Sequence, residues 1–353
     1  MLEDNPKPET TSQSDDVSIM SQPVREIIRE GNGRTPFWVL LGVVVGFLLP
    51  VCSCILFFAT TVAMGTFSRS DAPAIGTGDA VAVVRVEGTI SSSDKEDLSA
   101  AAGAVSGVVI SDLKKAAADP TVKAIVLRVD SPGGTVTGSA QIYEAILEME
   151  KPVVVSMASV AASGGYYVSA PADYIFARPD TVTGSIGVIL TIYNAKELLN
   201  ELGVDVISIT SGPNKALGSF WEEMTPEQQQ ILEDFVQESY DEFVRVVAEG
   251  RNMSEEEVRE LADGRIYTGR QALENGLVDE LGNLEDAIQK AAELGGITGE
   301  PRIVEYEHLP SFTEFLTGFS SRLNRSEADA ALEVISEFTT PKLEYRYVGP
   351  GSE

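Results

Sequence analysis

The sequence has very little cysteine and histidine. Cys52 and Cys54 are the only cysteines, and both lie inside one apolar run, while His308 is the single histidine among 353 residues. Disulfide frameworks, structural zinc sites and thiol nucleophiles need more of these side chains than remain outside that run. The sequence therefore predicts no metal site, and any chemistry has to be carried by other residues.

Basic residues are also scarce. The chain has 26 Lys and Arg against 54 Asp and Glu, which gives a formal net charge of −28 at pH 7. A surface of this charge repels a phosphate backbone, so nucleic acid is excluded as a partner. The same charge favours a hydrated, soluble surface, but it says little about the fold.

Charge is absent altogether from residues 35–68. A helix rises roughly 1.5 Å per residue, so about 20 apolar residues cross a bilayer, and residues 37–65 are long enough to do so. The polar residues 1–36 come first, which is not the pattern of a cleaved signal peptide. Three arginines closely precede the run and only Arg69 follows at a similar distance. We therefore predict an uncleaved transmembrane helix in the lipid bilayer, with the N-terminus in the cytoplasm.

These features divide the chain into five parts, of which the fourth is globular. They are a disordered cytoplasmic tail (1–36), a transmembrane helix (37–65), a linker (66–79), a folded domain (80–300) and a C-terminal extension (301–353). The sequence does not indicate what the extension does.

Short apolar runs alternate with amphipathic patterns in the folded domain. The runs at 80–90, 123–129, 152–157 and 205–210 predict buried strands, and 139–151 and 194–203 predict helices. Further helical patterns occupy 226–251, 254–264, 269–276 and 284–296. The alternation indicates an α/β fold with parallel strands.

Two loops that follow predicted strands are candidates for a functional site. In the first, Gly133 and Gly134 form a turn whose backbone could approach a ligand closely. In the second, "SVAASGGYY", Ser163 follows a strand and precedes a possible helix start. Its hydroxyl and the Gly164 N–H would then lie at the positive end of a helix dipole. Either loop alone is also compatible with an ordinary turn.

A nucleophilic serine needs a base to accept its proton. His308 lies near the polar C-terminal end, after the last apolar helix, and is not favoured. A lysine serves only when it is neutral, which requires lowering an ordinary lysine pKa of about 10.4 by roughly three units, or about 4 kcal/mol. Lys215 is the only charged residue between Asp205 and Glu222, so it is the best candidate.

Five motifs together resemble one family. "LRVDSPGGTV", "ASVAASGGYYVSA", "TVTGSIGVI", "SGPNKALGSF" and "ADGRIYTGRQALENGLVDELG" occur in that order. They resemble the signal peptide peptidase A family, membrane-anchored serine proteases with a Ser/Lys dyad. The resemblance covers roughly residues 80–300 and implies a Clp-protease/crotonase-like fold.

The resemblance also implies roles for individual residues. Ser163 corresponds to the nucleophile, Lys215 to the general base and Ser185 to a serine that supports the lysine. Gly133 or Gly134, together with Gly164, would supply the backbone N–H groups of an oxyanion site. Neither a metal nor an organic cofactor is implied.

The same resemblance implies substrates, partners and a location. The expected substrates are apolar peptides, particularly remnants of cleaved signal peptides, at the outer face of a prokaryotic cytoplasmic membrane. In compact relatives the dyad is shared between neighbouring subunits, so we expect a homo-oligomer in which one subunit supplies Ser163 and the next supplies Lys215.

Two alternatives remain open on sequence grounds. One is a crotonase-like hydratase or isomerase acting on an acyl-CoA thioester, although the loops of Ser163 and Ser185 lack the paired carboxylates that such enzymes generally use. The other is an inactive membrane scaffold, which the presence of both Ser163 and Lys215 disfavours.

Overall fold

The computed structural model describes residues 78–92, 103–306 and 342–349, together with the single positions 42, 46 and 53. The chain divides into two units, residues 1–72 and 73–353, and the second contains all the elements below. The predicted transmembrane helix at 37–65 lies outside the described residues, except for positions 42, 46 and 53, which are helical. Within the described ranges, none of the helices combines the length and the apolar character that crossing a membrane requires.

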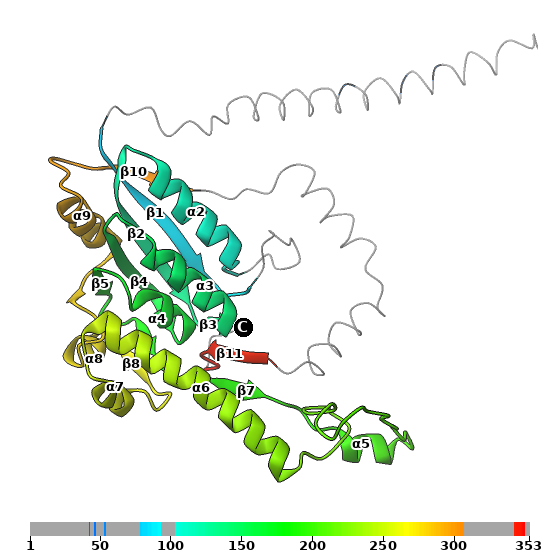
Figure 1. The fold of residues 1–353 in the computed structure, drawn as a ribbon. Coiled ribbons are helices and arrows are strands. Elements are labelled where there is room, and N and C mark those ends of the chain that lie inside the picture. The colour runs from blue at the N-terminus through cyan, green and yellow to red at the C-terminus, as the bar shows by residue number, and fades with distance from the viewer. Residues whose placement is uncertain are drawn as a thin grey trace, which may run out of the picture. The chain divides into compact units, whose positions relative to one another are not determined.

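A mostly parallel sheet forms the centre of the second unit (Figure 1). Its main strand order is β10-β1-β2-β4-β5-β9. In addition, β6 pairs parallel with the carboxyl-terminal end of β4, and β8 pairs antiparallel with β6. The strands are β1 (Ala80–Glu87), β2 (Val122–Ser131), β4 (Val153–Ala162), β5 (Tyr174–Ala177), β6 (Val182–Gly184), β8 (Ile266–Thr268), β9 (Glu280–Leu281) and β10 (Arg302–Glu305).

Helices cover both faces of this sheet (Figure 1). The helices of the described residues are α2 (Ser106–Ala118), α3 (Val136–Leu147), α4 (Gly164–Ser169), α5 (Lys196–Glu201), α6 (Pro226–Arg251), α7 (Glu255–Leu261), α8 (Gly269–Glu274) and α9 (Leu284–Leu294), of which α5 lies away from the sheet (Figure 1). The helix α9 packs against one face of β1, β2 and β4, and α2, α3 and α4 lie on the other.

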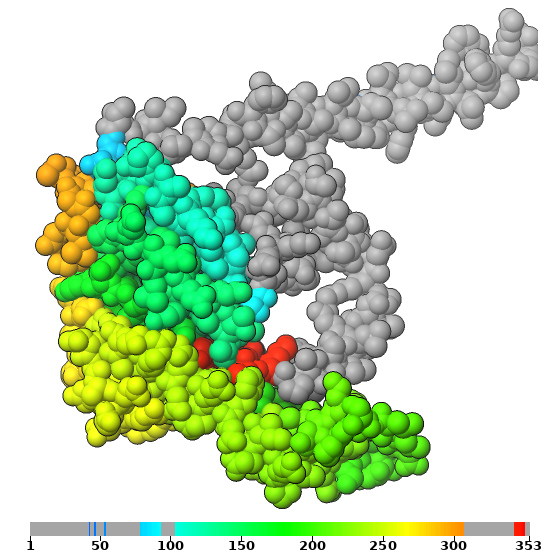
Figure 2. Space-filling model, in the orientation of Figure 1, coloured from blue at the N-terminus to red at the C-terminus, as the bar shows by residue number. Residues whose placement is uncertain are grey.

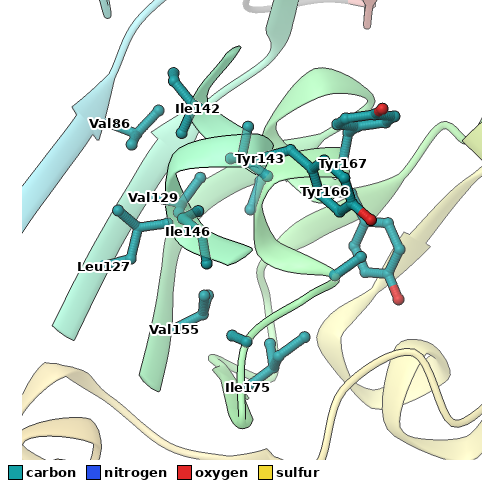
Figure 3. Packing of buried hydrophobic residues seen from close by; sticks show 14 of the residues in the cluster. Val86, Leu127, Val129, Ile142, Tyr143, Ile146, Val155, Tyr166, Tyr167 and Ile175 are labelled. Atoms are coloured by element: carbon teal, nitrogen blue, oxygen red, sulfur yellow. The ribbon is translucent and has the colours of Figure 1, made fainter. Parts of the chain in front are cut away.

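The core follows the alternation of side chains along each strand. In β2, Ile125, Leu127 and Val129 face the larger cluster, which they share with α2, α3, α4 and α6 (Figure 3). The intervening Ala124 and Val126 face α9 on the opposite side. Strands that are buried on both faces read as continuous apolar runs, which is why the sequence predicted them.

A second, three-stranded sheet lies beside the carboxyl end of the main sheet (Figure 1). It contains β3 (Gly133–Thr135), β11 (Lys342–Arg346) and β7 (Ile189–Thr191), with β11 between the other two. After β7, residues 192–225 form a segment that projects from the body and carries α5 (Figures 1 and 2). We call residues 192–225 the arm.

Most of the predicted elements are present, and one is wrong. The parallel strands beginning near residues 80, 123 and 152 are confirmed, as are helices in every predicted helical segment. Residues 205–210, predicted as a buried strand, have no regular structure and are mostly exposed. Their β-branched side chains favour a strand only where a neighbouring strand and a covering layer are present, and the arm offers neither to this segment.

Candidate active site

Ser163 occupies the sharp turn between β4 and α4. Its backbone has φ 53° and ψ −117°, and the residue is only 1% exposed. Its N–H donates to the Gly184 carbonyl at 2.8 Å, and its own carbonyl accepts from the Tyr167 N–H at 2.8 Å. A positive φ at a non-glycine residue costs about 1–3 kcal/mol and persists where the surroundings fix it. A strained strand-to-helix turn of this kind is typical of nucleophilic serines in α/β hydrolases.

Ser185 directly follows the strand β6, which lies beside β4 in the sheet. The parallel strands β4 and β6 pair Ala162 with Gly184, so Ser163 and Ser185 each directly follow one member of that pair. Ser185 also has a positive φ, 50°, and is buried, and its N–H donates to the Arg265 carbonyl at 2.8 Å. The structure therefore brings together two serines that the sequence separates by the helix α4 and the strands β5 and β6.

The predicted glycines meet at the same place. Gly133 has φ +93°, and a side chain there would collide with the Tyr345 carbonyl oxygen and lie 2.5 Å from the Gly164 nitrogen. A side chain at Gly164 would lie 3.1 Å from the Gly133 Cα. Only glycine allows the two backbones to approach this closely. The Gly133 N–H donates to the Ser131 hydroxyl at 3.1 Å, whereas Gly134 pairs with Tyr345 of β11.

Two polar side chains that sequence reasoning did not single out hold these turns. The Ser131 hydroxyl donates to the Gly88 carbonyl at 2.6 Å while accepting from Gly133, and it thereby fixes the glycine turn. The Asp130 carboxylate accepts from the Val160 N–H at 3.0 Å, just before the Ser163 turn. Both residues belong to the "DSPGG" segment, but no local sequence signal indicates which backbone groups they bind.

Lys215 is not brought to Ser163 within one chain. It lies in an exposed turn of the arm, where its N–H donates to the Gly212 carbonyl at 3.2 Å. The arm has little core of its own: α5 has no buried residue, and Ile207 and Ile209 are 84% and 97% exposed. The described part of a single chain therefore does not supply the burial that a lysine base requires.

Gln228 ties the Lys215 turn to the start of α6. Its side chain accepts from the Thr225 N–H at 3.1 Å, while the Thr225 hydroxyl accepts from the Gln228 N–H, which forms a capping box. The Gln228 amide also donates to the Pro213 carbonyl at 3.1 Å. The "TPEQ" segment indicates the cap from sequence, because Thr three residues before Gln is a helix-start signal. The contact with Pro213 could not be inferred.

The C-terminal strand β11 also lies at the site, and sequence reasoning missed it. Residues 342–348, "KLEYRYV", alternate polar and apolar side chains, which is a strand pattern. Tyr345 is fully buried, and burial raises the pKa of its hydroxyl and of the Tyr167 hydroxyl, so both stay protonated at neutral pH. Across the described ranges, His, Cys, Asp and Glu nowhere gather into a group of three that could hold a metal ion.

Comparison with known proteins agrees with this architecture. Residues 99–182 match the model of the Clp protease family, and residues 145–298 match that of peptidase family S49. The fold is thus α/β with a Clp-protease-like domain. A candidate protease of Synechocystis sp., slr0021, is 44% identical over 231 residues, which are 62% of this chain and 83% of that protein.

Further relatives carry more specific names. A candidate signal peptide peptidase SppA of Enterococcus faecium is 39% identical over 257 residues, 68% of this chain and 73% of that protein. Protease 4 of Salmonella typhi is 40% identical over 222 residues, 62% of this chain and 35% of that protein. The chain belongs to peptidase family S49 and is a serine protease.

Proposed function

We propose that the protein is a membrane-anchored endopeptidase that uses Ser163 as nucleophile and Lys215 as general base. The observation that carries this proposal is the strained, buried turn of Ser163 beside the Gly133–Gly164 contact. A buried serine beside a glycine-lined backbone gap is the arrangement that acyl transfer needs, since the nucleophile and the oxyanion donors must flank one carbonyl group.

The reaction proceeds through an acyl-enzyme. Lys215 in its neutral form takes the Ser163 proton as the oxygen attacks the substrate carbonyl carbon, and the developing oxyanion accepts from the Gly164 N–H and a second backbone N–H. Gly134 is the better second donor, because the Gly133 N–H is already directed at Ser131. The protonated lysine then returns the proton to the leaving amine, and water hydrolyses the ester. Ser185 holds the lysine by a hydrogen bond.

The general base comes from a neighbouring subunit. Two features of the arm support this: Lys215 is exposed, and the same arm carries apolar side chains that no part of the described chain covers, including Ile207 and Ile209. Packing the arm on a second subunit would bury these side chains and desolvate Lys215 beside that subunit's Ser163. Such a contact is head-to-tail, and its repetition gives a ring when the rotation between subunits closes.

The substrates are apolar peptides, with remnants of cleaved signal peptides as the main class. This assignment rests on the apolar run at 37–65, which would anchor the chain in the bilayer, and on the name of the Enterococcus faecium relative. The anchor would hold the catalytic domain at the outer face of the cytoplasmic membrane, where such remnants are left.

The chemistry is tested with Ser163→Ala and Lys215→Ala, and with Lys196→Ala as a matched control on an exposed lysine of the same arm. We expect the first two to abolish hydrolysis of an apolar peptide and the control to retain it, with unchanged circular dichroism. A fluorophosphonate probe should label wild type at Ser163. Substantial turnover in folded Ser163→Ala or Lys215→Ala would exclude the dyad.

The anchor is tested separately by topology. A protease added outside spheroplasts should digest a tag placed after Glu353 but spare a tag placed before Met1. The reverse result would place the active site in the cytoplasm and remove the signal-peptide assignment, while leaving the dyad intact.

A further inference from the structure

The motif that begins "ADGRIYTG" lies against the turn that carries Ser185. Part of it forms β8, which pairs antiparallel with β6 just before that turn. The Ser185 N–H donates to the Arg265 carbonyl at 2.8 Å, which continues the pairing into the turn. The Gly264 N–H donates to the Ile186 carbonyl at 3.2 Å. The motif therefore binds the backbone before, at and after the turn, and we call residues 261–268 the clamp loop.

The Ser185 turn has a backbone conformation that needs support. Gly184 has φ +77° and Ser185 has φ 50°, so two consecutive residues are left-handed. Glycine adopts this region freely, but a residue with a side chain keeps it only where its surroundings fix it. The direction of the Ser185 side chain follows from this backbone. Contacts that fix the turn therefore decide where the Ser185 hydroxyl lies.

The ring of Tyr267 supports the turn at Gly184. A side chain at Gly184 would lie 2.5 Å from the Tyr267 Cδ2 atom, so the ring occupies the space beside the Gly184 Cα. Tyr267 is buried, and its hydroxyl donates to the Leu261 carbonyl at 2.8 Å. Burial raises the pKa of this hydroxyl, so it remains a donor at neutral pH. The ring is thus held by β8 at one end and by Leu261 at the other.

Asp263 fixes the backbone that accepts from Ser185. Its carboxylate accepts from the Arg265 N–H at 3.1 Å and from the Arg265 Nε at 2.7 Å. The first of these bonds closes an Asx turn around Gly264, whose φ is +86°. It thereby sets the course of the chain at Arg265, whose carbonyl holds the Ser185 N–H. Hydrogen bonding from Arg265 lowers the pKa of Asp263 to about 2, so the carboxylate stays an acceptor wherever a lysine base titrates.

The turn and the clamp loop share an open space. Ser185 lines a cleft of about 550 Å³ together with Ala262, Asp263 and Gly264 of the clamp loop. In the proposed mechanism, Lys215 of a neighbouring subunit hydrogen-bonds to Ser185. The cleft provides room beside Ser185 for that side chain, and the clamp loop forms one of its walls.

We propose that Tyr267 and Asp263 are positioning residues, which fix the Ser185 turn and so aim the hydroxyl that supports the lysine base. Tyr267 acts on Gly184, and Asp263 acts on the Arg265 carbonyl. Neither side chain has to touch the substrate. The inference rests on the proposed function for the role of Ser185, but the rigidity of the turn is measurable without catalysis.

Hydrogen exchange in the full chain measures that rigidity first. Tyr267→Leu keeps a buried apolar side chain but removes the ring beside Gly184. We expect the amides of residues 183–187 to exchange about 10-fold faster, because the turn opens more often, and those of α2 to be unchanged. Tyr267→Phe keeps the ring and loses only the bond to Leu261, so its exchange should stay near that of wild type. Unchanged exchange in Tyr267→Leu would overturn the inference.

A double-mutant cycle on peptide hydrolysis then tests whether Tyr267 acts through Ser185. We expect Tyr267→Leu to lower kcat by about 10-fold with little change in KM, because alignment matters chiefly in the transition state. In the Ser185→Ala background the aimed hydroxyl is missing, so the same change should cost less than about twofold. Phe176→Leu, which alters a buried aromatic residue of β5 beside α9, is the matched control and should act equally in both backgrounds.

The outcomes separate this inference from the proposed function. Equal losses from Tyr267→Leu in the two backgrounds would overturn the inference, because Tyr267 would then matter only for the fold. A folded wild-type protein that protects residues 183–187 from exchange but hydrolyses no peptide would instead remove the proposed function.

Asp263 is tested against a similar ion pair on another turn. Asp180 accepts from the Arg178 guanidinium at 3.1 Å, again across two residues and exposed to solvent. Asp263→Asn keeps an oxygen acceptor for the Arg265 N–H and should retain about a third or more of kcat, whereas Asp263→Ala should lower kcat by about 10-fold. Asp180→Ala should retain the wild-type rate. Equal kcat values for Asp263→Ala and Asp180→Ala would overturn the assignment of Asp263.

Discussion

Ser163 lies at the buried end of β4, whereas Lys215 lies in an exposed turn of the arm. Around Ser163, paired strands, positive-φ turns and glycine contacts fix the course of the backbone within one chain. Around Lys215, local turns and the Gln228 side chain supply the described hydrogen bonds, and apolar side chains of the arm face solvent. In the proposed dyad, the Ser163 side is thus formed within one chain, whereas the Lys215 side would need a covering surface.

The largest expected effect concerns whether these two regions come from different chains. Ser163→Ala and Lys215→Ala are each expected to be inactive, but co-assembly in equal amounts should restore activity at about one quarter of sites, because a head-to-tail interface pairs intact residues at random. Peptide hydrolysis by mixed oligomers, isolated through two different tags, measures this. Mixed oligomers that stay inactive would show that Ser163 and Lys215 of one site belong to the same chain.

The next largest effect concerns the close contact of the Gly164 backbone with Gly133, beside Ser163. Gly164→Ala places a methyl group 2.6 Å from the Ser139 hydroxyl and 3.1 Å from the Gly133 Cα, so the backbone has to shift. Displacement of one oxyanion donor should lower kcat by about 100-fold or more. Gly78→Ala, where nothing lies within 4 Å of the added carbon, is the control and should retain activity. Normal turnover in Gly164→Ala would show that this backbone takes no part in catalysis.

Substitutions of exposed apolar residues in the arm should change the assembly of subunits rather than the stability of the fold. Ile207→Asp and Ile209→Asp replace side chains that are almost fully exposed in the single chain, so the melting temperature should change by only a few degrees. The variants should nevertheless dissociate into inactive monomers, as light scattering and hydrolysis would show. Leu147→Asp, which changes an exposed apolar residue on α3, should remain assembled. An active monomer would mean that Lys215 needs no neighbour.

The smallest effect concerns how the arm positions its lysine. Gln228→Ala removes the hydrogen bond to Pro213, two residues from Lys215, and should lower kcat/KM by about fivefold, a loss of about 1 kcal/mol. Thr225→Ala removes the capping box but leaves the Pro213 contact in place. It should destabilise the protein by about 1 kcal/mol with little change in rate. Equal rate losses in both variants would indicate that only the helix start matters.

The sequence by itself determined the strands β1, β2 and β4, most of the helical segments and the identity of the candidate residues. Residues 124–127 are apolar at every position, as a strand buried on both faces requires, and the order of the motifs around Ser163 and Lys215 identified the family. These signals are local, so a single sequence reveals them.

Only the tertiary structure decided which of these residues meet. Residues 205–210 have the side chains of a strand, but they lie on the arm without a partner, because β-structure depends on neighbours that the local sequence does not specify. Likewise, β11 pairs with β3 across more than 200 positions of sequence, and nothing in "KLEYRYV" indicates that partner. The contact of Gly133 with Gly164, and the exposure of Lys215, arise from how the chain is packed, which is why they became visible only in three dimensions.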